Sequence, residues 1–280
     1  MIVYRTKKDL IQHLNALTDS GKSIGLVPTM GALHLGHASL VEKATLTDDI
    51  VVVSIFVNPA QFNDPADLEK YPRSLDNDLE LLQSLNVDLV FVPSEREMYP
   101  EENTRAFSLG NLDKVMEGKK RAGHFNGVAR IVANLFEIVN PTRAYFGQKD
   151  FQQLVIVRRL VEILNVKPEI VSCPIVREAD GLAMSSRNIR LTQEERQHAP
   201  FIYITLQLAR EKRGSLSPAE IRSWVISQFK DQPNMQLEYF EIVEDKELRP
   251  VLDWEEKVNK VGCLAVQLGG VRLIDNLIFD

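Results

Sequence analysis

The chain has 280 residues, enough for one large domain or two modest domains. Its composition, with 44% hydrophobic and 26% charged residues, is ordinary for a soluble globular protein. The formal net charge of −6 argues against a nucleic-acid binder that depends on a broad basic surface, although a local cationic site for a nucleotide is compatible with it.

Three features of the sequence bear on where the protein resides. Charges interrupt the apolar residues at positions 1–8, so we expect no signal peptide, and no apolar run is long enough to span a bilayer. Cys173 and Cys263 are the two cysteines, and neither has a partner at metal-ligand spacing, so a zinc site is not expected. Scattered cysteines suit a reducing compartment, and we expect a cytoplasmic protein without membrane contact.

Apolar runs alternate with amphipathic stretches as far as about residue 175. The runs predict buried strands at residues 24–27, 50–57, 87–92, 144–146 and 170–171. The stretches predict helices at residues 9–17, 39–46, 75–85, 128–139 and 151–164. This alternation predicts an α/β fold, a Rossmann-like parallel sheet covered on both faces, with ligands beyond the carboxyl ends of the strands.

The pattern changes after Pro174. Thr192 with Glu195, and Ser217 with Glu220, predict two helix starts with capping boxes. Strand-like runs follow at residues 236–243, 262–268 and 271–273. We therefore expect a Rossmann-like domain at residues 1–175 and a smaller α+β domain at residues 176–280 that closes over the active site, with a ligand cleft between the two.

The most informative motif, P-T-M-G-A-L-H-L-G-H at residues 28–37, follows the first predicted strand. The apolar spacing after it fits a helix, so His34 and His37 lie where that helix begins. Helix starts bind phosphate through unpaired N–H groups, the imidazoles add donors, and Gly36 permits close approach to the backbone. A single histidine here would more often be a surface turn residue, but the pair favours a phosphate site.

The H-x-G-H segment resembles the signature of a nucleotidyltransferase superfamily. The longer motif resembles that of the pantothenate synthetase family, ATP-dependent ligases that join pantoate to β-alanine. Further segments match this family in the same order along nearly the full chain: F-V-N-P-A-Q-F at 56–62, Y-P-R-S-L-D-N-D at 71–78, G-H-F at 123–125, F-G-Q-K-D-F-Q-Q at 146–153 and M-S-S-R-N at 184–188.

The resemblance implies an assignment of substrates to residues. The expected ATP-binding residues are Pro28, Thr29, Met30, His34, Gly36, His37, Gly147, Lys149, Asp150, Val176, Met184, Ser185, Ser186 and Arg187. The expected catalytic residues among them are His34, His37, Lys149, Ser185, Ser186 and Arg187. The expected pantoate-binding residues are Met30, Asn58, Gln61, His124 and Gln153, with Asn126 and Arg130 as further candidates for the same pocket.

Each segment also has a plainer interpretation. Asn58 starts an Asn-Pro turn, although neutral amides suit hydroxyl and carboxylate groups. Asp150 could be an N-cap whose capping box Gln153 completes, yet Lys149 then stands where the helix dipole disfavours a cation, which suggests a phosphate partner. Ser185 to Arg187 could form a solvated loop, although hydroxyls followed by arginine suit a phosphate clamp.

The family's acids near Y-P-R imply a magnesium ion that accompanies ATP and is contacted mostly through water. Ser74 or Asp76 could simply cap the following helix. Asn77 stands where many relatives have an acid, which leaves Asp78 as the best candidate, through water.

The family resemblance implies that pantoate, ATP and β-alanine form pantothenate, AMP and pyrophosphate through a pantoyl adenylate, in a homodimer. Two alternatives stay open: an adenylyltransferase that makes a dinucleotide product, and a non-catalytic nucleotide-binding protein. The polar pocket expected around Asn58, Gln61 and Gln153 argues against the first. AMP release from ATP and pantoate, with and without β-alanine, separates all three.

Overall fold

The computed structural model describes residues 1–18, 20–101 and 105–279, and the chain forms two compact units. The first unit comprises Met1–Gly147 and Ile156–Pro174, and the second comprises Gln148–Val155 and Ile175–Asp280. The sequence predicts one domain over residues 1–175, whereas the structure groups residues 148–155 with the second unit. The reason is local, because Asn276 near the end of the chain donates hydrogen bonds to the backbone carbonyls of Gln148 and Lys149.

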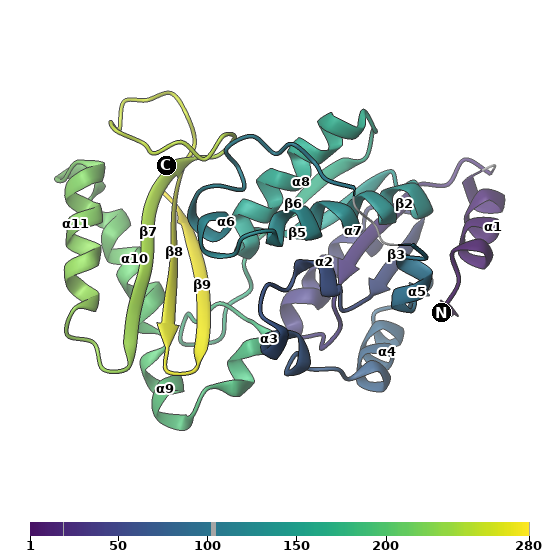
Figure 1. Ribbon diagram of the computed structural model, residues 1–280, viewed down its shortest axis with the longest axis horizontal. Coiled ribbons are helices and arrows are strands. Elements are labelled where there is room, and N and C mark those ends of the chain that lie inside the picture. Colours follow the sequence, from purple (N-terminus) through teal and green to yellow (C-terminus); the bar gives the residue numbers. More distant parts are fainter. Residues whose placement is uncertain (19, 102–104, 280) are drawn as a thin grey trace. The chain divides into compact units, whose positions relative to one another are not determined.

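The first unit contains a six-stranded sheet in which every pair of neighbours is parallel (Figure 1). The strands are β1 (Ile2–Tyr4), β2 (Ile24–Thr29), β3 (Ile50–Ile55), β4 (Leu89–Phe91), β5 (Arg143–Gly147) and β6 (Glu169–Cys173), in the order β1-β4-β3-β2-β5-β6. The predicted parallel α/β fold is confirmed. Strand β1 was not predicted, because its three residues are too few for a periodic pattern.

Helices connect these strands and complete the hydrophobic core. The helical segments are α1 (Lys7–Thr18), α2 (Leu35–Thr45), η1 (Pro59–Gln61), α3 (Pro65–Glu69), α4 (Leu75–Ser84), α5 (Glu95–Met98), α6 (Met116–Lys120), α7 (His124–Val139) and α8 (Phe151–Leu164), of which α8 begins in the second unit. Every residue of β3 is buried, as expected for a parallel strand covered on both faces. The predicted apolar face of α7 is confirmed, because Val128, Ile131, Val132, Leu135 and Ile138 are all buried.

The strand order positions two of the predicted motifs. From β2 the chain adds β3 and β4 on one side, and later adds β5 and β6 on the other, so the order reverses between β2 and β5. Leu26 of β2 lies opposite Ala144 of β5, so Thr29 and Gly147 end their strands level with each other. Ligands of open parallel sheets bind at the carboxyl ends of the strands beside such a switch point.

The second unit packs helices against a three-stranded antiparallel sheet. Its strands, in sheet order, are β7 (Met235–Glu244), β8 (Lys260–Leu268) and β9 (Val271–Ile278). Its helical segments are η2 (Gln148–Asp150), η3 (Ser186–Arg190), α9 (Gln193–His198), α10 (Phe201–Glu211), η4 (Lys212–Gly214) and α11 (Pro218–Phe229). Both predicted capping boxes are confirmed, at Thr192 with Glu195 and at Ser217 with Glu220.

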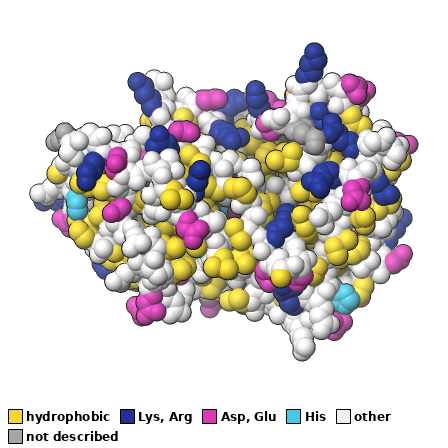
Figure 2. All heavy atoms as spheres, turned by 180° about the vertical axis from the view of Figure 1, so that it is seen from behind, with side chains coloured by type: hydrophobic (Ala, Val, Ile, Leu, Met, Phe, Trp, Pro, Cys, Tyr) yellow, Lys and Arg dark blue, Asp and Glu magenta, His cyan; other side chains and the backbone are white. Residues whose placement is uncertain are grey.

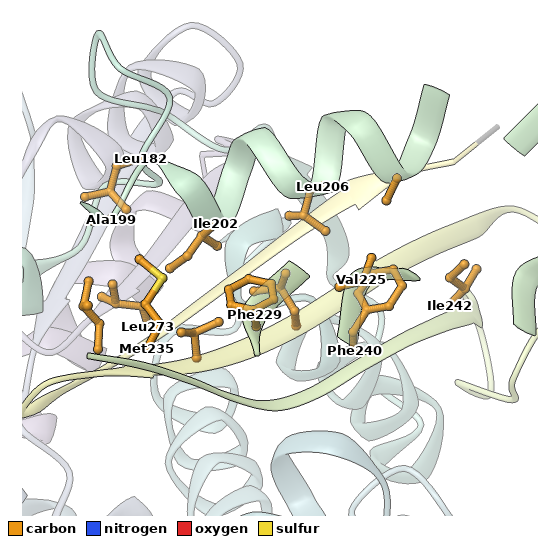
Figure 3. Close-up of a cluster of buried hydrophobic side chains, with 14 of the residues drawn as sticks. Leu182, Ala199, Ile202, Leu206, Val225, Phe229, Met235, Phe240, Ile242 and Leu273 are labelled. Atoms are coloured by element: carbon orange, nitrogen blue, oxygen red, sulfur yellow. The ribbon is translucent and has the colours of Figure 1, made fainter. Parts of the chain in front are cut away.

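A separate hydrophobic core holds the second unit together. Figure 3 shows Ile202 and Leu206 of α10 and Val225 and Phe229 of α11 gathered with Phe240 of β7. Strand β9 is longer than the predicted 271–273 and reaches Ile278. Its continuation was missed because a carboxylate and an amide, at positions 275 and 276, interrupt the apolar run although both are buried.

Two expectations from the sequence concern a broad basic surface and a membrane-spanning segment. Basic and acidic side chains are interspersed on the face that Figure 2 shows, so no broad basic area covers that face. Within residues 1–18, 20–101 and 105–279, none of the helices combines the length and the apolar character that crossing a membrane requires.

Candidate active site

The H-x-G-H motif lies at the predicted junction of strand β2 and helix α2. His34 is the N-cap of α2, and its Nδ1 accepts a hydrogen bond from the N–H of Gly36 at 3.1 Å. The Nδ1 of His37 accepts the backbone N–H of His34 at 3.3 Å, and the ring centroids of the two histidines are 4.2 Å apart. The two imidazoles therefore form a reciprocal capping box, a role that Ser or Thr and Glu or Gln usually share.

This cap determines which ring nitrogens carry protons. A neutral imidazole has one acceptor nitrogen and one donor nitrogen, so an Nδ1 that accepts leaves the proton on Nε2. Both histidines thus have an Nε2–H donor on the side of the ring away from the cap. Gly36 was expected to permit close approach of a phosphate to the backbone, and in this structure its own N–H donates to His34. At the start of this helix, the imidazole N–H groups can therefore donate to an anion in place of the backbone N–H of Gly36.

A buried carboxylate holds the turn between β2 and this helix. Asp78 of α4 is 2% exposed, and its two oxygens accept the backbone N–H groups of Ala32 and Leu33 at 2.9 and 2.8 Å. Gly31 and Ala32 have φ angles of +78° and +49°, and this left-handed region is unfavourable for alanine. The charge-assisted hydrogen bonds from Asp78 offset the strain and set the path of the chain into His34.

The acids around Asp78 differ from the sequence expectation. Ser74, one of the two residues considered as a cap, occupies the N-cap position of α4, but its side chain makes no capping hydrogen bond. Its hydroxyl instead donates to Asp78 at 3.2 Å. Among the described residues, no group of three or more His, Cys, Asp or Glu side chains is arranged to hold a metal ion. The geometry thus gives Asp78 a role in the loop, and its contact with magnesium through water stays a prediction.

Four of the predicted pantoate-binding residues lie together in the first unit, around Asn58. Asn58, the N-cap of η1 three residues after β3, is 1% exposed, and its Nδ2 donates to Gln61 Oε1 at 3.0 Å and to the carbonyl of Gly127 at 3.1 Å. Its Oδ1 accepts the N–H of Ala60 and the hydroxyl of Tyr99, at 3.3 and 2.8 Å. Every hydrogen-bonding position of the amide is thus used by the protein. This arrangement orients Gln61, and direct binding of pantoate by Asn58 stays a prediction.

Gln61 is fixed from several directions. Its Nε2 donates to the sulfur of Met30 at 3.0 Å, and its backbone carbonyl lies 2.7 Å from Nδ1 of His124. Arg121 donates to Nε2 of His124 at 3.2 Å, so His124 carries its proton on Nδ1 and donates to Gln61. His124 is therefore a support of Gln61 in this structure. Arg121 was not predicted, although it lies two residues before the G-H-F motif, because nothing in the local sequence indicates its contact with His124.

Helix α7 approaches this group closely. A Cβ at Gly127 would lie 2.0 Å from the carbonyl oxygen of Ala60, so only glycine permits this contact. Asn126, a further candidate for the pocket, accepts the N–H of Phe107 at 2.8 Å.

Burial raises the pKa of Tyr99 to about 12, and the nearby charge of Arg130 opposes that rise. Tyr99 was not predicted, because its link to Asn58 spans 41 positions in the sequence.

The Lys149 segment forms the short helix η2 in the second unit. Lys149 and Gln153 are half-buried and Asp150 is exposed, whereas Gln152 is only 5% exposed. The predicted contact with a substrate requires an accessible side chain. Gln153, which is half-buried, meets this requirement better than the buried Gln152 does. Asn276 donates to the carbonyl of Lys149 at 3.0 Å, a contact that the sequence analysis did not predict.

The S-S-R loop lies in the same unit and follows a tight hairpin. The carbonyl of Val176 accepts the N–H of Met184 at 3.0 Å, which pairs these two predicted ATP-binding residues. Ser185 is the N-cap of η3, and its hydroxyl accepts the N–H of Arg187 at 3.3 Å. Ser185, Ser186 and Arg187 are all partly exposed. The loop therefore has an ordered backbone with accessible hydroxyl and guanidinium groups.

Comparisons with known proteins bear on nearly the whole chain. The family model described as pantoate-beta-alanine ligase matches residues 2–278. The pantothenate synthetase of Phocaeicola vulgatus is 55% identical over 278 residues, covering 99% of each chain, and that of Porphyromonas gingivalis is 49% identical over 273 residues, covering 98% of this chain and 96% of the relative.

Solved structures give the same result. The crystal structure of pantothenate synthetase from Thermus thermophilus has a TM-score of 0.92, with 43% identity and 99% coverage of each chain. That of the pantoate-beta-alanine ligase from Francisella tularensis, complexed with beta-gamma ATP and beta-alanine, has a TM-score of 0.82 at 37% identity, covering 100% of this chain and 98% of the other. Together with the family match, these similarities show that the chain belongs to the pantoate–β-alanine ligase family.

Proposed function

We propose that residues of both units act in the reaction of this family, the condensation of pantoate with β-alanine to pantothenate, AMP and pyrophosphate through a pantoyl adenylate. ATP contacts the residues predicted from the motifs: Pro28, Thr29, Met30, His34, Gly36, His37, Gly147, Lys149, Asp150, Val176, Met184, Ser185, Ser186 and Arg187. Pantoate contacts Met30, Gln61 and Gln153, and Asn58 and His124 take part through the hydrogen bonds that fix Gln61. The Francisella tularensis relative was solved in complex with beta-gamma ATP and beta-alanine, which supports ATP and β-alanine as two of the substrates.

In the first step the pantoate carboxylate attacks the α-phosphorus of ATP. A carboxylate with a pKa of about 4 is already ionised at neutral pH, so this step needs no base. A bond forms between a carboxylate oxygen and the α-phosphorus, and pyrophosphate leaves with the electron pair of the broken P–O bond. Alignment and charge stabilisation are what the protein must supply. The Nε2–H groups of His34 and His37, the Lys149 ammonium and the S-S-R loop supply them.

In the second step the amine of β-alanine attacks the acyl carbon of the adenylate. The C–N bond forms, AMP leaves with the electron pair of the acyl C–O bond, and the nitrogen releases its proton to solvent. No protein nucleophile takes part. Both cysteines are buried, and burial raises the pKa of Cys173, which disfavours its reactive thiolate.

Magnesium enters this proposal with ATP. The ion neutralises phosphate charge when bound, and Mg²⁺ commonly keeps several waters and uses substrate phosphates as ligands, so a cage of protein carboxylates is not required. Asp78 is the predicted contact, through water. The assembly is a homodimer in the cytoplasm, as the family resemblance implies.

The observation that carries the proposal is the paired histidine cap at the start of α2, because Nδ1 of each ring accepts a backbone N–H and the proton of each neutral imidazole is therefore on Nε2. The reaction path is tested with pantoate labelled with ¹⁸O in its carboxylate. Attack at the α-phosphorus leaves one label in each AMP after the amide forms. AMP without label would show that the carboxylate does not attack that phosphorus and would overturn the proposal.

A further inference from the structure

A buried polar pair, Asp275 and Asn276, lies near the end of the last strand of the second unit. The two side chains are 4% and 5% exposed, within a strand whose other residues are mostly apolar. Burying a carboxylate and an amide is unfavourable unless both are fully hydrogen-bonded. The hydrogen-bond partners of Asp275 and Asn276 therefore indicate why these two polar residues are present in strand β9.

Asn276 is bonded to the turn that carries Lys149. Its Nδ2 donates to the carbonyl of Gln148 at 2.8 Å and to the carbonyl of Lys149 at 3.0 Å. These two bonds use both N–H donors of the amide. The backbone from which the Lys149 side chain extends is thus fixed to β9 by a residue 127 positions away.

Asp275 is bonded to the hairpin that precedes the S-S-R loop. Its two oxygens accept a bidentate pair of hydrogen bonds from Arg177, at 2.6 and 2.9 Å, and one of them also accepts the N–H of Asn276 at 2.7 Å. Arg177 donates in addition to the carbonyl of Gly181 at 3.0 Å, and its guanidinium carbon lies 3.7 Å from the ring centroid of Tyr203. Such bidentate pairs fix geometry as well as charge.

The hairpin in turn holds the S-S-R loop through Asn188, the residue that follows Arg187. Asn188 donates to the carbonyl of Ala183 at 3.2 Å and to the carboxylate of Glu178 at 2.9 Å. Arg196 pairs with Glu178 and with Asp180 on the same hairpin. Hydrogen bonds of the pair on β9, together with the backbone of the hairpin, therefore join the Lys149 turn to the loop of Ser185.

We propose that Asn276 and Asp275 are positioning residues for ATP, which set the Lys149 turn and the S-S-R loop against the same triphosphate. This inference rests on the proposed function, which gives Lys149 and the S-S-R loop their roles. Asn276 holds the backbone of Lys149 directly. Asp275 acts through Arg177 and the hairpin. A small displacement of such groups is sufficient to slow a reaction whose catalysis consists of alignment.

The test uses Asn276→Ala, with Asn259→Ala as the control, because Asn259 is an exposed asparagine of the same unit whose amide donates to Asp245. Single-turnover pyrophosphate release, the KM for ATP and the KM for pantoate are measured with thermal unfolding. Asn276→Ala is expected to slow pyrophosphate release about 100-fold and to leave the KM for pantoate unchanged. The control keeps wild-type values. A folded Asn276→Ala enzyme with a wild-type rate would overturn the inference.

A double variant separates this inference from the proposed function. If Asn276 acts through Lys149, the variant carrying both Lys149→Ala and Asn276→Ala is no slower than Lys149→Ala alone. Effects that multiply would overturn the inference and leave the function of Lys149 standing. A wild-type rate in Lys149→Ala would instead refute the proposed function.

A second variant covers the case in which Asn276→Ala does not fold. Arg177→Lys keeps the positive charge but loses the bidentate contact with Asp275, and it is expected to slow pyrophosphate release with an unchanged KM for pantoate. A folded Arg177→Lys enzyme with a wild-type rate, or unfolding of both variants, would assign the pair to stability alone and overturn the inference.

Discussion

The two units hold their predicted phosphate-binding segments in opposite chemical ways. In the first unit the turn before His34 offers backbone N–H groups, and the carboxylate of Asp78 accepts two of them. In the second unit the turn of Lys149 offers backbone carbonyls, and the amide of Asn276 donates to two of them. Asp78 and Asn276, which we call the anchors of the two turns, are both buried, and each comes from an element distant in sequence from the turn that it holds. The motif thus supplies the chemistry, and a remote residue of complementary polarity supplies the geometry.

The difference in charge between the anchors has consequences. Asp78 holds a turn with Ala32 in a strained conformation and makes charge-assisted bonds, which are about twice as strong as neutral ones. Asn276 is neutral and adds no negative charge beside the lysine that is proposed to bind phosphate. We therefore expect losses at the first anchor to appear mainly in stability, and losses around the second mainly in catalysis.

The largest expected effect is the loss of first-step rate when Lys149 of the second unit is replaced. Lys149→Ala removes the cation proposed to stabilise phosphate charge and should slow pantoyl-adenylate formation by about 10³-fold. The fold should be retained, because Asn276 holds the turn through backbone carbonyls that the substitution leaves in place. Pyrophosphate release and thermal melting are measured together, with Lys167→Ala at an exposed position as the control. Near-normal release would refute the assignment.

The next largest effect is expected when either histidine at the start of α2 in the first unit is replaced. His34→Ala and His37→Ala should each slow the first step by about 100-fold and change the affinity for pantoate much less, because they act on charge that develops in the transition state. His34→Asn sharpens the test, since asparagine is a good N-cap but lacks the Nε2–H donor. It should melt near the wild-type temperature and stay slow. Retention of the rate by His34→Asn would show that His34 serves only as a cap.

The sequence predicts these motifs, and it singles out Asp78 as a magnesium contact, but it does not predict the hydrogen bonds that hold the motifs in place. Buried strands and the alternation of strands and helices follow from apolar periodicity, and the motifs follow from their local order. The bonds of Asp78 to Ala32 and of Asn276 to Lys149 span 46 and 127 positions, so no local pattern reports them. One signal was present: an adjacent acid and amide inside an apolar strand is a costly arrangement that implies partners elsewhere.

The third prediction distinguishes an anchor from a metal contact in the first unit. Asp78→Asn keeps the shape but turns an N–H donor toward the backbone N–H of Ala32 or Leu33, so it should destabilise the protein by about 1–3 kcal/mol. Urea unfolding measures this change, and Asp76→Asn on the exposed side of α4 is the control. Unchanged stability with a higher magnesium requirement would favour the metal role over the anchoring role.

The smallest expected effects compare an amide from each unit. Gln61→Ala and Gln153→Ala should each weaken pantoate binding by about 1–3 kcal/mol with little effect on ATP, because each is proposed to bond the hydroxyl or carboxylate groups of pantoate. Gln61 is held by Asn58 and by the backbone contact of His124, so its effect should be the larger of the two. Calorimetric titrations with ATP and with pantoate measure both affinities separately. Equal losses for the two ligands would indicate structural damage, and a selective loss of ATP affinity would show that the two substrates are assigned to the wrong residues.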